Sequence, residues 1–152
     1  MIIVLAVLIG IVAGLRAFTA PAAVSLAAVY CGLKVAGTPL AFMGYHWTPW
    51  IFAAVALAEL VGDQLPATPS RKVPVQFGTR VVMGALAGGT IAASSMLFVG
   101  VLAGAVGAVL GTLGGAAGRA RLAAVLKNDR PAGLIEDVIA IAGAWLIVCG
   151  GL

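Results

Sequence analysis

Long uninterrupted apolar runs dominate the hydrophobic pattern of this chain. They cover residues 1–33, 49–65, 77–98, 99–118 and 132–152. None of them alternates with the period of two that marks a half-buried strand or a barrel strand. A membrane-spanning helix needs roughly 20 apolar residues, and only helices and closed barrels satisfy their backbone polar groups in lipid. The pattern therefore predicts an all-α polytopic membrane bundle of about five spans, a single transmembrane domain over the whole chain.

The first apolar run is too long for one straight span. A helix over residues 1–33 would measure roughly 50 Å, against a hydrocarbon core of roughly 30 Å. Pro21 removes the hydrogen bond to the carbonyl of Ala17 and favours a break close to Arg16. The run is therefore expected to form either one kinked span or a re-entrant pair of half-helices, as at many transporter binding sites.

Composition agrees with a membrane protein. Hydrophobic residues make up 62% of the 152-residue chain and charged residues 9%, against about 25% charged in a typical soluble domain. The formal net charge of +4 suggests no nucleic-acid role, because in a membrane protein an excess of basic residues mainly marks which loops face the cytoplasm. Basic residues gather in the polar loops 66–76 and 119–131, so the positive-inside rule predicts that these loops are cytoplasmic, in a bacterial inner membrane, with the C-terminus outside.

The opposite face should carry an aromatic belt. Tyr45, His46 and Trp47 lie in a Gly- and Pro-containing connector, with Trp50 just beyond it. Cys31 and Cys149 fall near the same face, where they either stay unpaired or form a disulfide.

Several kinds of chemistry find no support in the sequence. Two cysteines and one histidine match no recognised spacing of a metal site, so no metal is expected. No phosphate-binding loop, nucleophile elbow or dinucleotide fingerprint is present. We therefore expect no cofactor and no enzymatic activity.

Small residues recur every four positions in the third and fourth apolar runs. Such rows let helix backbones approach closely. The glycines expected to pack helices in this way are Gly84, Gly88, Gly104, Gly107, Gly111 and Gly115. The packing could lie within one chain or between subunits, and we expect a homodimer or higher oligomer.

A weak internal repeat runs through the two halves of the chain. Residues 14–16, Gly-Leu-Arg, resemble residues 78–80, Gly-Thr-Arg. An acidic pair follows each, at residues 59 and 63 and at residues 136 and 137. If the first run is broken in two, each half has three helical pieces, and the halves would be related by inversion.

Ionisable residues inside apolar runs cost several kcal/mol and mark either a function or a specific pair. The candidates here are Arg16, Glu59, Asp63, Arg80, Glu136 and Asp137. Arg16 and Glu59 fall at matching depth, which predicts an ion pair between them. Asp63 should lie closer to the cytoplasm, with Arg80, Glu136 and Asp137 forming a gate cluster there. These charges either hold the bundle together or line a solvated path.

The motifs resemble a known bacterial family. The run Gly-Leu-Arg-Ala-Phe-Thr-Ala-Pro at 14–21 and the run Glu-Leu-Val-Gly-Asp-Gln-Leu-Pro-Ala-Thr-Pro-Ser-Arg at 59–71 are similar to the membrane proteins catalogued as domain of unknown function 4126. Arg80, the Gly-rich middle runs and residues 136 and 137 fit the same pattern. The resemblance implies a compact multi-span protein, adds the loop residue Arg71 to the candidate site, and assigns no activity.

Two functions follow as hypotheses. The first is a small transporter or channel for a polar or ionic solute, with the buried Arg, Glu and Asp residues along its path. The alternative is a non-transporting protein that binds a membrane lipid or a partner membrane protein, as a scaffold or assembly factor.

Overall fold

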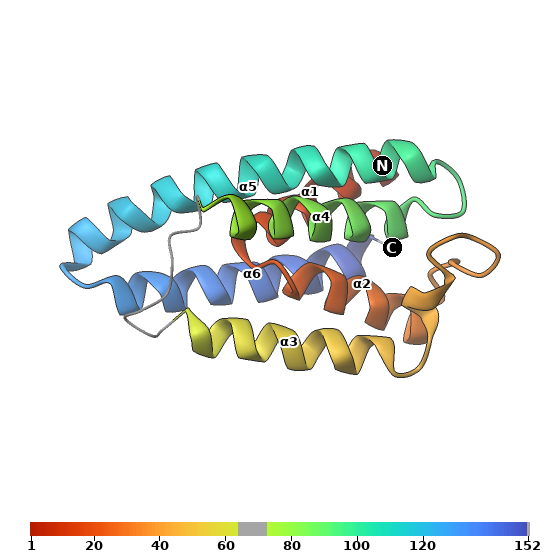
Figure 1. The fold of residues 1–152 in the computed structure, drawn as a ribbon, viewed down its shortest axis with the longest axis horizontal. Coiled ribbons are helices and arrows are strands. Elements are labelled where there is room, and N and C mark those ends of the chain that lie inside the picture. The colour runs from red at the N-terminus through yellow and green to blue at the C-terminus, as the bar shows by residue number, and fades with distance from the viewer. Residues whose placement is uncertain (64–72, 152) are drawn as a thin grey trace.

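The computed structural model describes residues 1–63 and 73–151 and is all-helical over these ranges. Six α-helices run roughly along one long axis, with a short 3₁₀ turn between the second and third (Figure 1). Their bounds are α1 Ile2–Leu15, α2 Thr19–Tyr30, η1 Ala41–Gly44, α3 Thr48–Gly62, α4 Pro74–Ile91, α5 Leu97–Leu126 and α6 Asp129–Gly151.

The first apolar run folds as two half-helices that form a hairpin. The chain leaves helical geometry at Arg16, whose backbone is extended, and α2 then runs back beside the rest of the bundle (Figure 1). Pro21 sits in the first turn of α2, where its missing N–H costs no helical hydrogen bond. Of the two arrangements predicted for residues 1–33, the structure has the pair of half-helices instead of one kinked helix.

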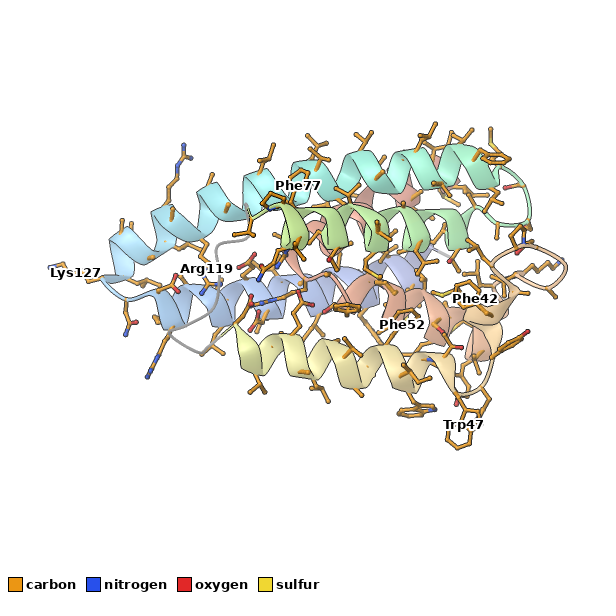
Figure 2. All side chains as sticks on the ribbon, viewed as in Figure 1. Phe42, Trp47, Phe52, Phe77, Arg119 and Lys127 are labelled. Atoms are coloured by element: carbon orange, nitrogen blue, oxygen red, sulfur yellow. The ribbon has the colours of Figure 1, made fainter. Side chains whose placement is uncertain are left out.

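The bundle has two chemically different ends. The N-terminus, the connector 31–47, the turn 92–96 and the C-terminus lie at one, which we call the aromatic end. The opposite end, which we call the basic end, carries the α5–α6 turn. Trp47 and Lys127 mark these two ends in Figure 2, and Tyr45, Trp47 and Trp50 are all exposed, as an interfacial belt requires.

The fourth apolar run extends further than predicted. Residues 119–131 were expected to form a loop, but α5 continues to Leu126, because residues 119–126 contain good helix formers and no glycine or proline. Lys127 adopts a left-handed conformation that ends the helix. Asn128 then accepts a hydrogen bond from the N–H of Arg130 at 3.1 Å, at the start of α6.

The third predicted run, 77–98, is also shifted in the structure. Helix α4 begins at Pro74, which suits the first turn, and ends at Ile91. The turn to α5 is therefore at residues 92–96 instead of 98–99.

The glycine rows bring α1, α4 and α5 into backbone contact. A Cβ on Gly84 or Gly88 would overlap backbone atoms of Gly104 on α5. On the other side of α5, a Cβ on Gly107 or Gly111 would overlap the backbone of α1. Gly115, one turn beyond Gly111, is half-buried. These contacts lie within one chain, so an oligomer would have to use another face.

The two halves of the chain run in opposite senses. Helices α1, α2 and α3 each point the opposite way to α4, α5 and α6 taken in order (Figure 1). Their lengths differ, most of all α2 with 12 residues and α5 with 30. The directions match the inverted relation that the sequence hinted at, whereas the lengths do not repeat.

Two helices of the described residues have both the length and the hydropathy of a membrane span. Helices α5 and α6 are both long enough and apolar enough to cross a membrane. Helices α1, α2 and α3 are apolar but have 10–17 residues. Length and composition therefore support a membrane protein in part, without showing five spans.

The glycine contacts give a first prediction. In Gly104→Ala the new methyl group would meet the backbone of Gly84 and Gly88, so we expect a loss of about 1–3 kcal/mol of stability. Gly114→Ala is the matched control, because no atom lies within 4 Å of a Cβ built there and alanine favours the helix. Thermal unfolding of the purified proteins in detergent would measure both. A Gly104→Ala midpoint equal to wild type would contradict this packing.

Candidate functional site: a charge cluster at the hairpin tip

Charged side chains from several helices surround the tip of the α1–α2 hairpin. We call these residues the charge cluster: Arg16, Glu59, Asp63, Arg80, Arg119, Asp129, Glu136 and Asp137. All five acidic residues of the chain belong to it. It lies within the bundle, closer to the basic end than to the aromatic end.

Arg16 is the centre of the cluster. It is the break residue of the hairpin and is fully buried, with 0% of its side chain exposed. Its Nε donates to Oδ1 of Asp137 at 2.5 Å, and its two terminal nitrogens form ion pairs with Asp63 and Asp137. One guanidinium thus ties the hairpin tip to the C-terminal end of α3 and to α6.

Glu59 caps the start of α2. Its two carboxylate oxygens accept hydrogen bonds from the backbone N–H groups of Ala17 and Phe18, at 2.9 and 3.1 Å. These amides have no partner within a helix, and a negative charge also suits the positive end of the helix dipole. The N-cap residue Phe18 makes no side-chain hydrogen bond of its own that caps α2. A side chain of α3 supplies this cap instead.

Arg80 caps the end of α1. Its Nη1 donates to the carbonyl oxygens of Gly14 at 2.8 Å and Leu15 at 2.5 Å. A positive charge suits the negative end of the α1 dipole. The Nη2 of Arg80 also lies 3.5 Å from Oε1 of Glu59. The two caps of the broken helix are thus an ion pair with each other.

Close packing at Gly14 supports the same break. A Cβ on Gly14 would overlap backbone atoms of α5, so only glycine allows this approach. The hydroxyl of Thr112 lies within hydrogen-bonding distance of the carbonyls of Gly14 and Ala108, at 3.3 and 2.8 Å. Thr112 was not among the predicted site residues, because a threonine inside an apolar run carries no signal of its own.

Arg119 extends the cluster toward the basic end. Its guanidinium donates to both carboxylate oxygens of Asp129, at 2.9 and 2.6 Å, and lies 3.8 Å from Oε2 of Glu136. In Figure 2 the side chain of Arg119 points from α5 toward α6. It was missed as a site residue because residues 119–131 were expected to form a loop.

The six charged residues predicted to share a site do gather around the tip, but their pairing differs from the prediction. The predicted ion pair between Arg16 and Glu59 is wrong, because the break turns the Arg16 side chain toward Asp63 and Asp137 and presents backbone amides to Glu59. Arg80 was expected beside Glu136 and Asp137, yet it contacts the end of α1 and Glu59. The loop residue Arg71 lies outside the described residues.

The charged side chains of the cluster differ in exposure. The guanidinium side chains of Arg16 and Arg80 are 0% and 3% exposed, whereas the carboxylate side chains of Glu59, Asp63 and Asp137 are 11–12% exposed. The side chain of Arg119 is 15% exposed and that of Glu136 is 7% exposed, so groups of both signs are open to a molecule that reaches the cluster. Carboxylates suit protons, metal cations or organic cations as partners, and guanidinium groups suit anions.

Within residues 1–63 and 73–151, no three His, Cys, Asp or Glu side chains are grouped to hold a metal ion. Cys31 and Cys149 are both exposed and carry free thiols. Comparisons with models of protein families, with curated proteins and with solved structures give no match.

The buried pairing of Arg16 leads to a second prediction. Arg16→Gln would leave the carboxylates of Asp63 and Asp137 without this counter-charge inside the bundle, so we expect a loss of about 3–5 kcal/mol of stability. Arg121→Gln removes the same charge from an exposed position on α5 and should change stability by less than about 0.5 kcal/mol. Unfolding midpoints in detergent would compare the two. Equal midpoints would mean that Arg16 does not hold the tip.

Proposed function

We propose that the chain is an integral membrane protein in which α3, α4, α5 and α6 cross the bilayer. The α1–α2 hairpin enters from the aromatic end and returns to it. Large apolar side chains exposed on the outer surface support this, among them Ile51 and Val61 on α3, Leu102 on α5 and Leu146 on α6. A water-soluble protein rarely exposes so much apolar surface. Helices α3 and α4 are short for a crossing, which a locally thinned bilayer accommodates.

Orientation follows from the basic residues. Arg121, Lys127 and Arg130 lie toward the basic end, and Lys34 belongs to the connector at the aromatic end. The positive-inside rule places the basic end in the cytoplasm, which in a bacterium means an inner-membrane protein with both termini outside. A C-terminal reporter found in the cytoplasm would contradict this orientation. The resemblance to domain of unknown function 4126 suggests the same kind of protein.

For its activity, we propose a small transporter or channel for a polar or ionic solute. The observation that carries this proposal is a helical hairpin whose tip places two helix ends and a charge cluster inside the bundle. Interrupted helices of this kind expose backbone groups at the depth where transported solutes bind. A purely structural role would be served more simply by an unbroken apolar helix, because buried ion pairs add little stability over well-packed apolar side chains.

The caps suggest how such a path would open and close. Glu59 can hold the amides of Ala17 and Phe18 only while its oxygens are available to them. A proton or cation that engages Glu59 competes with this cap and weakens the ion pair with Arg80. The hairpin tip would then be free to shift, and the path beside it would change its shape. Binding at the cluster and movement of the hairpin are therefore coupled in this proposal.

The proposed transporter or channel is an oligomer surrounded by membrane lipid. One small bundle leaves little room for a solute path, so we propose a homodimer or higher oligomer. Its interface would lie away from the α1–α4–α5 glycine contacts, on an apolar outer surface that otherwise meets membrane lipid.

Flux in proteoliposomes tests the proposed activity. The purified protein would be assayed with a panel of small ions and a pH-sensitive dye, beside the double variant Glu59→Gln, Asp63→Asn. We expect wild-type flux that falls at least about tenfold in the variant, because both carboxylates lie in the cluster. Arg121→Gln is the matched control, since it also removes a charge but from an exposed position on α5 outside the cluster.

The outcomes separate the two functional hypotheses. Flux that disappears in the double variant but persists in Arg121→Gln, with all three proteins folded, would support a transporter or channel with its path at the hairpin tip. No flux across the panel from folded wild type would contradict it. The non-transporting alternative, binding of a lipid or partner protein, would then be the better account.

A further inference from the structure

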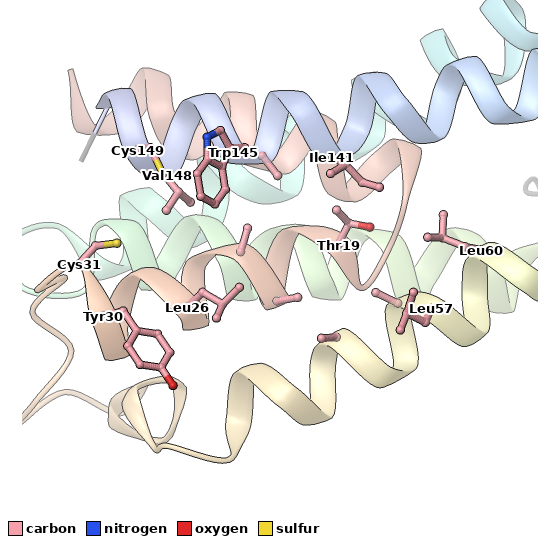
Figure 3. A pocket seen from close by; sticks show the side chains of 15 residues that line it. Thr19, Leu26, Tyr30, Cys31, Leu57, Leu60, Ile141, Trp145, Val148 and Cys149 are labelled. Carbon is pink, nitrogen blue, oxygen red and sulfur yellow. The ribbon is translucent and has the colours of Figure 1, made fainter.

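An apolar groove lies between α2, α3 and α6 (Figure 3). It encloses about 500 Å³, and all fifteen residues that line it are uncharged. Such a lining does not discriminate between one apolar molecule and another. A charged surface that can select its partner lies outside both the groove and the charge cluster, at the basic end of the bundle.

Three basic residues surround the turn between α5 and α6. Arg121 lies in the last two turns of α5, Lys127 ends that helix, and Arg130 lies in the first turn of α6. All three are exposed, and Lys127 marks their end of the bundle in Figure 2. We call these three residues the basic tip.

No carboxylate of the protein neutralises the basic tip. All five acidic residues belong to the charge cluster, and the one closest in sequence, Asp129, accepts hydrogen bonds from Arg119 at both oxygens. Within residues 1–63 and 73–151, the three residues of the tip form no ion pair. The rest of the chain, residues 64–72 and 152, contains no Asp or Glu. The tip therefore presents three positive charges to an external anion.

Apolar side chains lie among these charges. Val125 is 78% exposed and Leu126 is 42% exposed at the end of α5, and Leu134 is 56% exposed on α6. Such side chains are unfavourable in water, whereas the boundary between lipid headgroups and acyl chains suits both apolar and basic side chains. This mixture favours a membrane surface over a soluble polyanion as the partner of the tip.

The length of α5 places the tip at the level of the headgroups. Its 30 residues measure about 45 Å, and a bilayer with both headgroup layers is roughly 40–45 Å thick. The uncharged part, residues 97–118, measures about 33 Å and matches a hydrocarbon core of roughly 30 Å. When α5 crosses the bilayer, its last two turns therefore extend into the headgroup layer, where lipid phosphates lie.

We infer that the basic tip is a binding surface for anionic phospholipid headgroups. Arg121 and Arg130 donate paired N–H groups to phosphate oxygens, and Lys127 adds a point charge. Val125 and Leu126 contact the adjoining part of the acyl chains. A zwitterionic headgroup binds more weakly, because it carries its own positive charge beside the phosphate. The inference rests on the proposed function in one respect, namely that α5 and α6 cross the bilayer with the tip on the cytoplasmic side.

Lipid binding to the purified protein tests this inference. Phosphatidylglycerol and phosphatidylcholine with the same acyl chains would be titrated into the protein in a neutral detergent, and native mass spectrometry would count the bound lipids. We expect phosphatidylglycerol to bind at least about tenfold more tightly. Inorganic phosphate in large excess should not displace it, because the surface binds the apolar part of the lipid as well.

Removal of charge from the tip should remove this preference. One basic residue near an anionic surface changes the affinity roughly fivefold, so Lys127→Gln should weaken phosphatidylglycerol binding by about that factor. The triple variant Arg121→Gln, Lys127→Gln, Arg130→Gln should bind both lipids equally. Lys34→Gln is the matched control, because it removes the same charge from an exposed position at the aromatic end. The single Lys127→Gln variant keeps the test valid if the triple variant fails to fold.

The depth of Val125 gives a second, independent readout. A fluorophore on Val125→Cys, in a Cys31→Ser, Cys149→Ser background, would be reconstituted in vesicles that contain both lipids. We expect it to be quenched by a phospholipid with a nitroxide at its headgroup, because Val125 is exposed and the tip lies at that level. The tip lies outside the charge cluster, so the triple variant should retain wild-type flux in the proteoliposome assay.

The opposite results would overturn the inference. They are equal affinity of wild type for the two lipids, a phosphatidylglycerol preference that survives in the triple variant, and displacement by inorganic phosphate. An unquenched label at residue 125 would also overturn it, because the tip would then lie in water and suit a soluble acidic partner. Flux without lipid preference would leave the proposed function standing and remove this inference. Lipid preference without any flux would support the inference and contradict the transporter.

Discussion

The structure depends on one constraint, which is that two helix ends inside an apolar bundle must find polar partners. The end of α1 and the start of α2 leave carbonyl and amide groups largely buried within the bundle, where each unsatisfied group would cost several kcal/mol. Side chains from other helices supply those partners. Arg80 takes the carbonyls, Glu59 takes the amides, and each side chain has the sign of charge that the helix dipole favours.

This constraint links the other features. A guanidinium and a carboxylate brought in to cap helices must themselves be neutralised, and they lie 3.5 Å from each other. The break residue is itself an arginine, which requires Asp63 and Asp137 around it. The glycine contacts of α1 and α4 with α5 then bring the hairpin close enough for these contacts to form. The cluster is thus both the support of the fold and the polar site available for function.

Much of the architecture could be predicted from the sequence, because apolar runs and proline positions act locally. The helical class and the break before Pro21 follow from such signals, and charge within apolar runs marks Arg16, Asp63 and Asp137 as candidate site residues. The pairing could not be predicted, because it depends on which way the side chain turns at the break. The continuation of α5 through Arg119 was not predicted, because clustered charges after an apolar run usually indicate a loop, although arginine is a good helix former.

Glu59 and Arg80 keep the helix broken and folded back. The distance between spin labels on Val4→Cys and the native Cys31, in a Cys149→Ser background and in nanodiscs, tests this. These positions would be about 40 Å apart along a continuous helix. If the two side chains hold the break, the measured distance is much shorter and narrow, and it lengthens or broadens in the double variant Glu59→Gln, Arg80→Gln. A narrow distance near 40 Å in the otherwise unchanged protein, or a short one that the double variant leaves unchanged, would contradict it.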